Sequence, residues 1–166
     1  ADNQALFCGG RRGNIVTTYG EHAAVFSAAN ELARMGLEAR FAAPNSDGGV
    51  DVDSLLSLTD GKTSLGSVIN VNNETGAVND INAIAAAVKK KNPRTLFHAD
   101  GVQAYGKIPF RLSQNVDMYS LSAHNIGGVT VMGALIKRKK LGLSPKTSCG
   151  GQERVERDAT DPGVDL

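Results

Sequence analysis

The sequence is poor in cysteine and close to neutral in charge. Its two cysteines, Cys8 and Cys149, form neither a metal-ligand pair nor a disulfide framework. A reducing cytoplasm is therefore the expected compartment. The formal net charge is +1 in 166 residues, which indicates no strongly charged partner.

Aromatic residues make up only 5% of the chain. Two basic runs, 89–91 and 137–140, stand out against the neutral background. No aromatic residue interleaves with either run, so we interpret both as solvated faces and expect no nucleic-acid partner.

Long apolar runs are also lacking, so we expect no membrane span. The N-terminus has no basic region followed by an apolar core, and no signal peptide is expected. The first residue is Ala1 and not methionine. We therefore expect the chain to begin inside a longer gene product or after processing.

Short apolar runs alternate with helical periodicity. Apolar residues make up 41% of the chain, and the length suits one folded domain. The pattern predicts an α/β domain with a mainly parallel sheet. Strands are expected near 14–18, 37–43, 67–71, 95–99, 116–121 and 129–137. Helices are expected over 22–35, from Asp51 or Asp53, and from Asp80 to the lysines at 89–91.

Unusual polar residues follow three of these strands. They are Asn72–Glu74, Asp100 and Ser122–Asn125. Ligands of parallel sheets bind beyond the carboxyl ends of the strands. We therefore expect the three clusters to meet in one crevice.

Four segments, in their order and spacing, resemble the motifs of a known protein family. They are 71–76 (VNNETG), 97–107 (FHADGVQAYGK), 122–124 (SAH) and 150–154 (GGQER). Together they resemble the class V aminotransferase family, in particular its NifS/IscS-type cysteine desulfurases. The resemblance extends from about residue 1 to about residue 160.

The resemblance implies a fold, a cofactor and a reaction. The fold is the three-layer α/β/α sandwich of the large domain of pyridoxal-phosphate (PLP) transferases. Residues 1–145 correspond to this domain, incomplete at its N-terminus, and 146–166 to a loop-rich exit segment. The family reaction converts L-cysteine to L-alanine and enzyme-bound sulfur for iron–sulfur clusters, although selenocysteine lyases share most of these motifs.

The resemblance also assigns residues around the cofactor ring. His22 matches the histidine that stacks on the ring, and Asp100 matches the aspartate that pairs with the pyridinium nitrogen. A carboxylate there keeps the nitrogen protonated, so the ring can accept electrons. Gln103 and Asn73 match the residues beside the phenolic oxygen.

Other matched residues belong to the phosphate side. Ser122 and His124 match the pair next to the cofactor lysine, and Thr160 matches a threonine that reaches a phosphate in the partner subunit. Arg157 matches an arginine just before it. A dimer, with itself or with a homologous subunit, is therefore expected.

The match breaks at Asn125, where the family has the lysine that bonds covalently to PLP. An asparagine amide is neither nucleophilic nor basic, so it cannot form the covalent link or move a proton. We expect the family's phosphate loop to lie just before Ala1, and the 166 residues to contain no counterpart of the family's small domain, which carries the sulfur-accepting cysteine. We expect PLP without covalent attachment, and impaired activity for the chain alone.

Alternatives remain beside this interpretation. The chain could be a non-catalytic subunit or binding module that associates with a full-length homologue, or an enzyme that binds a nucleotide in the same crevice. His22 could simply cap a helix. The histidines show no metal-ligand spacing, Cys8 is expected in the core, and the glycine-rich stretch at 9–13 follows a helix, as a connector would.

Overall fold

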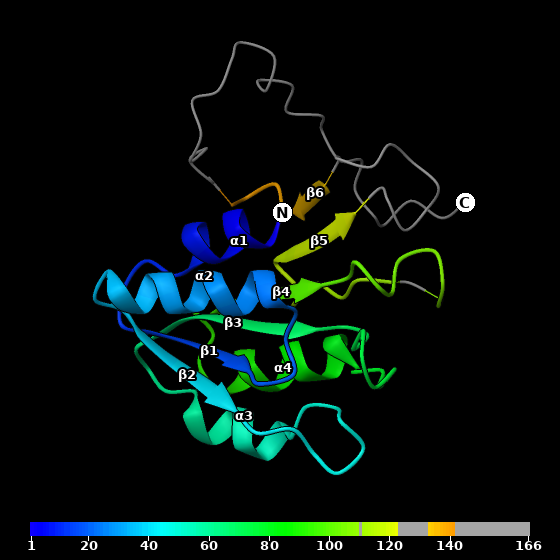
Figure 1. Cartoon of the computed structure of the whole chain (residues 1–166). Helices are drawn as coiled ribbons and strands as arrows, with labels where there is room; N and C mark the ends of the chain where they lie inside the picture. Colours follow the sequence, from blue (N-terminus) through cyan, green and yellow to red (C-terminus); the bar gives the residue numbers. More distant parts are fainter. Residues whose placement is uncertain (110, 123–132, 142–166) are drawn as a thin grey trace.

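The computed structural model describes residues 1–109, 111–122 and 133–141. Helices and strands alternate along this part of the chain (Figure 1). In order, the elements are α1 (Asp2–Gly9), β1 (Asn14–Thr18), α2 (Ala23–Arg34), β2 (Glu38–Ala42), α3 (Val52–Leu58), β3 (Thr63–Ile69), α4 (Ile81–Lys91), β4 (Leu96–Asp100), β5 (Met118–Ser122) and β6 (Gly133–Lys137).

One six-stranded sheet organises the domain, in the order β2-β1-β3-β4-β5-β6. The strands from β2 to β5 pair in parallel, and β6 pairs antiparallel with β5 at one edge. The predicted mainly parallel α/β sheet is therefore confirmed. The carboxyl ends of β1, β3, β4 and β5 lie at the same edge of the sheet, which places their following residues together.

Helices cover both faces of the sheet and make three layers (Figure 1). On one face, apolar side chains of α1 and α2, such as Leu6 and Leu32, pack with Ile15 and Leu65 of the strands. On the other face, α3 and α4 pack against Val68, Phe97 and Tyr119. The α/β/α sandwich expected from the resemblance is confirmed. Cys8 of α1 is 4% exposed and lies in the core, as predicted.

Capping residues explain where a helix begins and where another ends. The Asp51 side chain accepts a hydrogen bond from the Ser54 amide and caps α3, which decides between the two predicted caps. At the end of α2, the amides of Gly36 and Leu37 donate back to Ala33 and Leu32. Gly36 takes a φ of +98° there, a conformation that glycine adopts without strain.

Strand β3 differs most from the prediction. It runs from Thr63 to Ile69, whereas the sequence predicted 67–71. The Asn70 backbone amide still donates to Asp100 O at 2.8 Å, and the regular ladder ends there. The buried Asn70 side chain makes tertiary bonds: its amide nitrogen donates to Asn79 O at 3.0 Å, and its oxygen accepts from Tyr119 at 2.9 Å. The polar segment after the strand therefore begins at Asn70.

The cap of α4 offers a direct test of the local fold. Asp80 accepts a hydrogen bond of 3.0 Å from the Ala83 amide, so Asp80→Ala leaves that amide without its side-chain partner. We expect a loss of about 1 kcal/mol in unfolding free energy, measured by urea denaturation. Glu31→Ala, at an exposed position inside α2, is the control and should change stability by less than about 0.5 kcal/mol. Equal losses in both variants would contradict the capping role.

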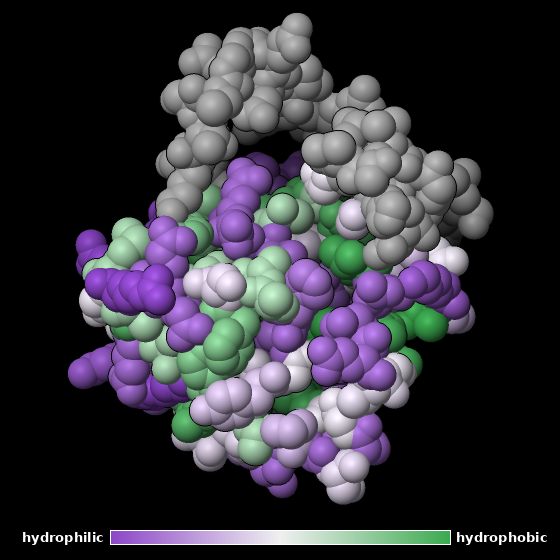
Figure 2. Space-filling model, in the orientation of Figure 1, coloured by the Kyte–Doolittle hydropathy of each residue, from purple (hydrophilic) through white to green (hydrophobic). Residues whose placement is uncertain are grey.

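The surface of the described part mixes residue types. On the face shown in Figure 2, hydrophilic and apolar residues are interspersed over the described elements. The most exposed large apolar side chains among the described residues are Tyr19, Met35 and Val78. No helix in this part of the chain has the length and apolar character needed to cross a bilayer.

Candidate functional site

A cavity of about 270 Å³ opens beyond the carboxyl ends of the strands. Its volume is slightly below the usual range of small-ligand pockets. Its wall includes residues from all three polar clusters predicted from the sequence: Asn73, Asp100 and Ser122. His22 and Gln103 also line it. The structure thus brings one residue of each predicted cluster, Asn73, Asp100 and Ser122, to the same cavity.

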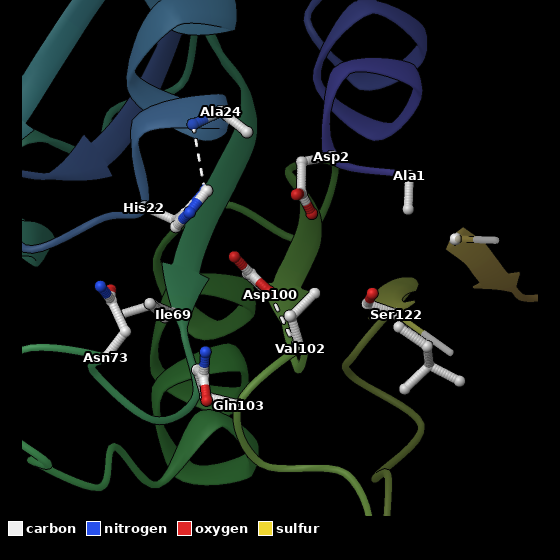
Figure 3. Close-up of a pocket in the computed structure, with 12 residues that line it drawn as sticks. Ala1, Asp2, His22, Ala24, Ile69, Asn73, Asp100, Val102, Gln103 and Ser122 are labelled. Carbon is white, nitrogen blue, oxygen red and sulfur yellow. Dashed lines mark hydrogen bonds between the residues drawn. The ribbon is translucent and has the colours of Figure 1, made fainter. Parts of the chain in front are cut away.

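Asp100 lies at the centre of this arrangement (Figure 3). It is the last residue of β4 and only 2% exposed. One of its oxygens, Oδ1, accepts a hydrogen bond of 2.9 Å from the Val102 amide. Burial, followed by the nearby Asp2, raises the pKa of Asp100 to about 6. A buried carboxylate with a raised pKa is prepared to bind a cation, because a positive partner restores the ordinary preference for the charged form.

Gly101 allows this position to exist. A Cβ atom added at Gly101 would overlap the ring carbons and the hydroxyl of Tyr119, which packs directly against the turn. The turn that follows carries Gln103 into the cavity wall. Lys107 donates a hydrogen bond of 2.8 Å to Gln103 Oε1. The amide nitrogen of Gln103 is thereby left toward Asp100 and the cavity (Figure 3).

His22 has two structural roles at once. It is the N-cap of α2, where its Nδ1 accepts a hydrogen bond of 3.2 Å from the Ala24 amide. The same ring lines the cavity on the side opposite Ser122 (Figure 3). Because Nδ1 is an acceptor, the neutral ring carries its proton on Nε2. The capping and cofactor-facing interpretations of His22 are therefore compatible.

Asn73 reaches the cavity from the loop after β3. Its neighbour Asn72 holds that loop: Asn72 Oδ1 accepts from the Glu74 and Thr75 amides at 2.8 Å each. The Asn72 Nδ2 group donates to Gly20 O at 2.9 Å. These bonds join the Asn73 loop to the segment that precedes His22, so two walls of the cavity are fixed to each other.

Two acidic residues near the cavity were missed by the sequence interpretation. Asp2, in the first turn of α1, lines the cavity, and its Oδ1 is buried without a hydrogen-bond partner. Glu21 precedes His22, and its Oε2 is likewise buried without a hydrogen-bond partner. Burial raises the pKa of Glu21 to about 8. Its position next to His22 was the signal available for Glu21, because the Ile69 amide that it binds lies 48 residues away in sequence.

His98 lies beneath the cavity in the middle of the sheet. Its two ring nitrogens each contact a serine hydroxyl at 2.8 Å, Ser67 on one side and Ser120 on the other. Complete burial lowers the pKa of His98 to about 4, so the ring is neutral at neutral pH. Its 3.7 Å approach to Asp2 is therefore not an ion pair between charged groups.

The remaining predicted residues lie outside the described part of the chain. They are His124, Asn125, Arg157, Thr160, Cys149 and the segment 146–166 with its glycine-rich signature. Within the described residues, no group of three or more His, Cys, Asp or Glu side chains is arranged to hold a metal ion.

The side chains that are described fit a pyridine-type cofactor. A buried carboxylate suits a protonated ring nitrogen, an imidazole ring offers a flat surface, and the amides and hydroxyl around them can bond ring oxygens. The unpartnered Asp2 oxygen adds negative charge beside this position. The donor set thus matches a cationic aromatic ring.

Comparisons with known proteins agree with this fold. The model of the aminotransferase class-V family matches residues 5–161. The chain is 39% identical to the mitochondrial cysteine desulfurase of Eremothecium gossypii over 95% of its length, and 38% identical to the cysteine desulfurase IscS of Proteus mirabilis over 96%. It covers 32% and 41% of those two proteins, so it spans less than half of the curated relatives.

Solved structures give the same result. A NifS-like protein superposes with a TM-score of 0.86 at 36% identity, over 92% of this chain and 44% of that one. DndA from Streptomyces lividans gives a TM-score of 0.81 at 34% identity, over 92% of this chain and 46% of that one. PLP is the cofactor of this family. The chain belongs to the aminotransferase class-V family, and the relatives it matches are cysteine desulfurases.

Proposed function

We propose that this chain is the cofactor-binding core of a cysteine-desulfurase-type protein that binds PLP without a covalent bond and is catalytically impaired by itself. The family reaction is the release of sulfur from L-cysteine, with L-alanine as the other product. The single observation that supports a cofactor site is the meeting of Asp100, His22, Gln103, Asn73 and Ser122 around one cavity.

Each of these side chains has a role that its geometry supports. The carboxylate of Asp100 would pair with the ring nitrogen, and the imidazole of His22 would lie against the ring. The free amide nitrogen of Gln103 would donate to the phenolic oxygen, with Asn73 beside it. When bound, PLP supplies an electron-accepting ring, which Asp100 strengthens by keeping the nitrogen protonated.

The residues proposed to bind the cofactor phosphate are assigned from the sequence motifs. Ser122, at the end of β5, lines the cavity next to Gly133. We infer that Ser122 and His124 bind the phosphate and that Thr160 contributes from a partner subunit of a dimer. The two cysteines form no disulfide framework, which suits a reducing compartment, and we infer the cytoplasm.

The impairment follows from Asn125. A carboxamide cannot attack the cofactor aldehyde and cannot take a proton from the substrate carbon near neutral pH. We therefore expect no measurable release of sulfide or alanine from cysteine by this chain. The substrate range, including selenocysteine, would have to come from other parts of a complete enzyme.

The direct test is an absorbance spectrum after incubation with PLP and desalting, for the natural chain and for Asn125→Lys. We expect a protein-bound band after desalting in Asn125→Lys and little or none in the natural chain, because only lysine forms the covalent link. An equilibrium titration without desalting should show PLP binding to both proteins.

Two results would contradict the proposal. Binding by neither protein at equilibrium would favour the alternative, a non-catalytic subunit that associates with a full-length homologue, and size-exclusion chromatography with such a homologue would then test association. Turnover of cysteine by the natural chain would contradict the assigned impairment.

A further inference from the structure

Glu21 links the ends of β1 and β3, and the end of β3 lines the cavity. Its Oε1 atom accepts a hydrogen bond of 3.0 Å from the Thr18 hydroxyl and one of 2.8 Å from the Ile69 amide. Thr18 ends β1, and Ile69 ends β3 and lines the cavity. The residue after Glu21 is His22, so this carboxyl group anchors the segment that presents the His22 ring.

The second oxygen of Glu21 has no such partners. Oε2 is buried and makes no hydrogen bond, although an ionised carboxylate needs acceptor bonds on both oxygens when it is buried. A neutral acid tolerates this position much better, because only the charged form loses a large solvation energy. The geometry therefore favours a proton on Oε2.

The charges around Glu21 act in the same direction. Asp100 on β4 and Asp2 on α1 both disfavour ionisation of Glu21. The charges of His22 and of the Ala1 amino group lower the pKa of Asp100 and so partly offset the effect of its burial. Between pH 6 and pH 8, the pKa values of about 6 for Asp100 and about 8 for Glu21 leave Asp100 ionised and Glu21 neutral.

We propose that Glu21 is a positioning residue of this site: as a neutral acid it fastens the ends of β1 and β3 together, orients His22, and leaves Asp100 as the ionised carboxyl that faces the ring nitrogen. The last part rests on the proposed function. The link between the strand ends and the division of charge are properties of the chain itself.

The division of charge can be measured without any cofactor. Carbon-13 NMR of labelled carboxyl groups, followed from pH 4 to pH 10, should show Glu21 titrating near pH 8 and Asp100 near pH 6. Asp100→Asn should lower the Glu21 midpoint, because it removes a neighbouring charge. Glu21→Gln should leave the Asp100 midpoint unchanged, because the natural side chain is already neutral in that range. A Glu21 midpoint near its ordinary value of 4.5 would overturn the proposal.

The positioning role is measured by binding of pyridoxine 5′-phosphate, which has the ring and phosphate but no aldehyde. At pH 7, Glu21→Gln keeps both bonds to Oε1 and should bind within about threefold of the natural chain. Glu21→Ala removes them and should bind at least tenfold more weakly. Equal weakening in both variants would mean that the negative charge is required, which overturns the neutral-acid role.

The two proposals fail in distinguishable ways. If the natural chain does not bind pyridoxine 5′-phosphate at all, the cofactor site is wrong, while the NMR titration still decides the protonation of Glu21. If the ligand binds but Glu21 titrates at acidic pH, the cofactor site stands and the role of Glu21 is wrong.

Discussion

Asp100→Asn should make the protein more stable and a poorer PLP binder at the same time. The asparagine oxygen can still accept from the Val102 amide, which Asp100 Oδ1 now does. It cannot carry the charge that pairs with a ring nitrogen. Removing one partner of a buried charge pair costs about 2 kcal/mol or more, which corresponds to roughly 30-fold weaker binding.

The stability gain has a definite pH range. Burial raises the pKa of Asp100 from 3.8 to about 6, so the folded chain holds this proton more tightly than the unfolded chain. Unfolding free energy therefore falls as pH rises from about 4 to 6, and the full cost is present above pH 6. Asp100→Asn removes that cost and should add about 1–3 kcal/mol at pH 8 and little at pH 4.

Urea denaturation at both pH values and a PLP titration at pH 7 check this prediction. Asp53→Asn, at an exposed position in the first turn of α3, is the matched control and should change neither quantity much. Loss of stability at pH 8 in Asp100→Asn would mean that the carboxylate has a structural partner in the folded protein. Unchanged binding would remove Asp100 from the cofactor site.

Gly101→Ala should produce the largest loss of stability. The added methyl group would occupy the space of the Tyr119 ring, and Tyr119 cannot move freely because it is fully buried and donates a hydrogen bond to Asn70. Overpacking of this kind costs about 3 kcal/mol or more, or a decrease in Tm of roughly 10 °C for a chain of this size.

Thermal unfolding of three further variants separates the clash from other effects. Gly61→Ala has no atom within 4 Å of the new methyl group and should be nearly neutral. Tyr119→Leu should be destabilising alone, but the double variant Gly101→Ala/Tyr119→Leu should lose less than the two single variants added together. Simple additivity would show that the Tyr119 ring is not the obstacle.

The sequence predicted the framework well because the framework depends on local patterns. Periodicity located α2 and β1, and side-chain capping at Asp80 and Asp51 marked the starts of α4 and α3. The end of β3 was predicted two residues too late, at Val71 and not at Ile69, next to Asn70, whose side chain makes tertiary bonds with distant residues. No local pattern carries that information.

The site was predicted only in part, because some of its residues follow local patterns and others do not. Strand-end position and motif spacing identified Asp100, Asn73 and Ser122. Asp2 and Glu21 were not identified, because their importance depends on burial and on charges contributed by distant segments. The need for glycine at position 101 depends in turn on the Tyr119 ring, which the fold brings there from another strand.

The order in which the cavity wall is synthesised has a consequence for folding on the ribosome. Ala1 and Asp2 begin the wall, and Gly133 of β6 completes the described part of it. A Cβ atom at Gly133 would lie 3.8 Å from the backbone nitrogen of Ala1, so the first and last described wall segments are neighbours. Contacts this distant in sequence form late and slowly. The nascent chain can thus assemble the sheet up to β5 while the cavity still lacks one side, so the described wall is completed only after β6 emerges from the exit tunnel.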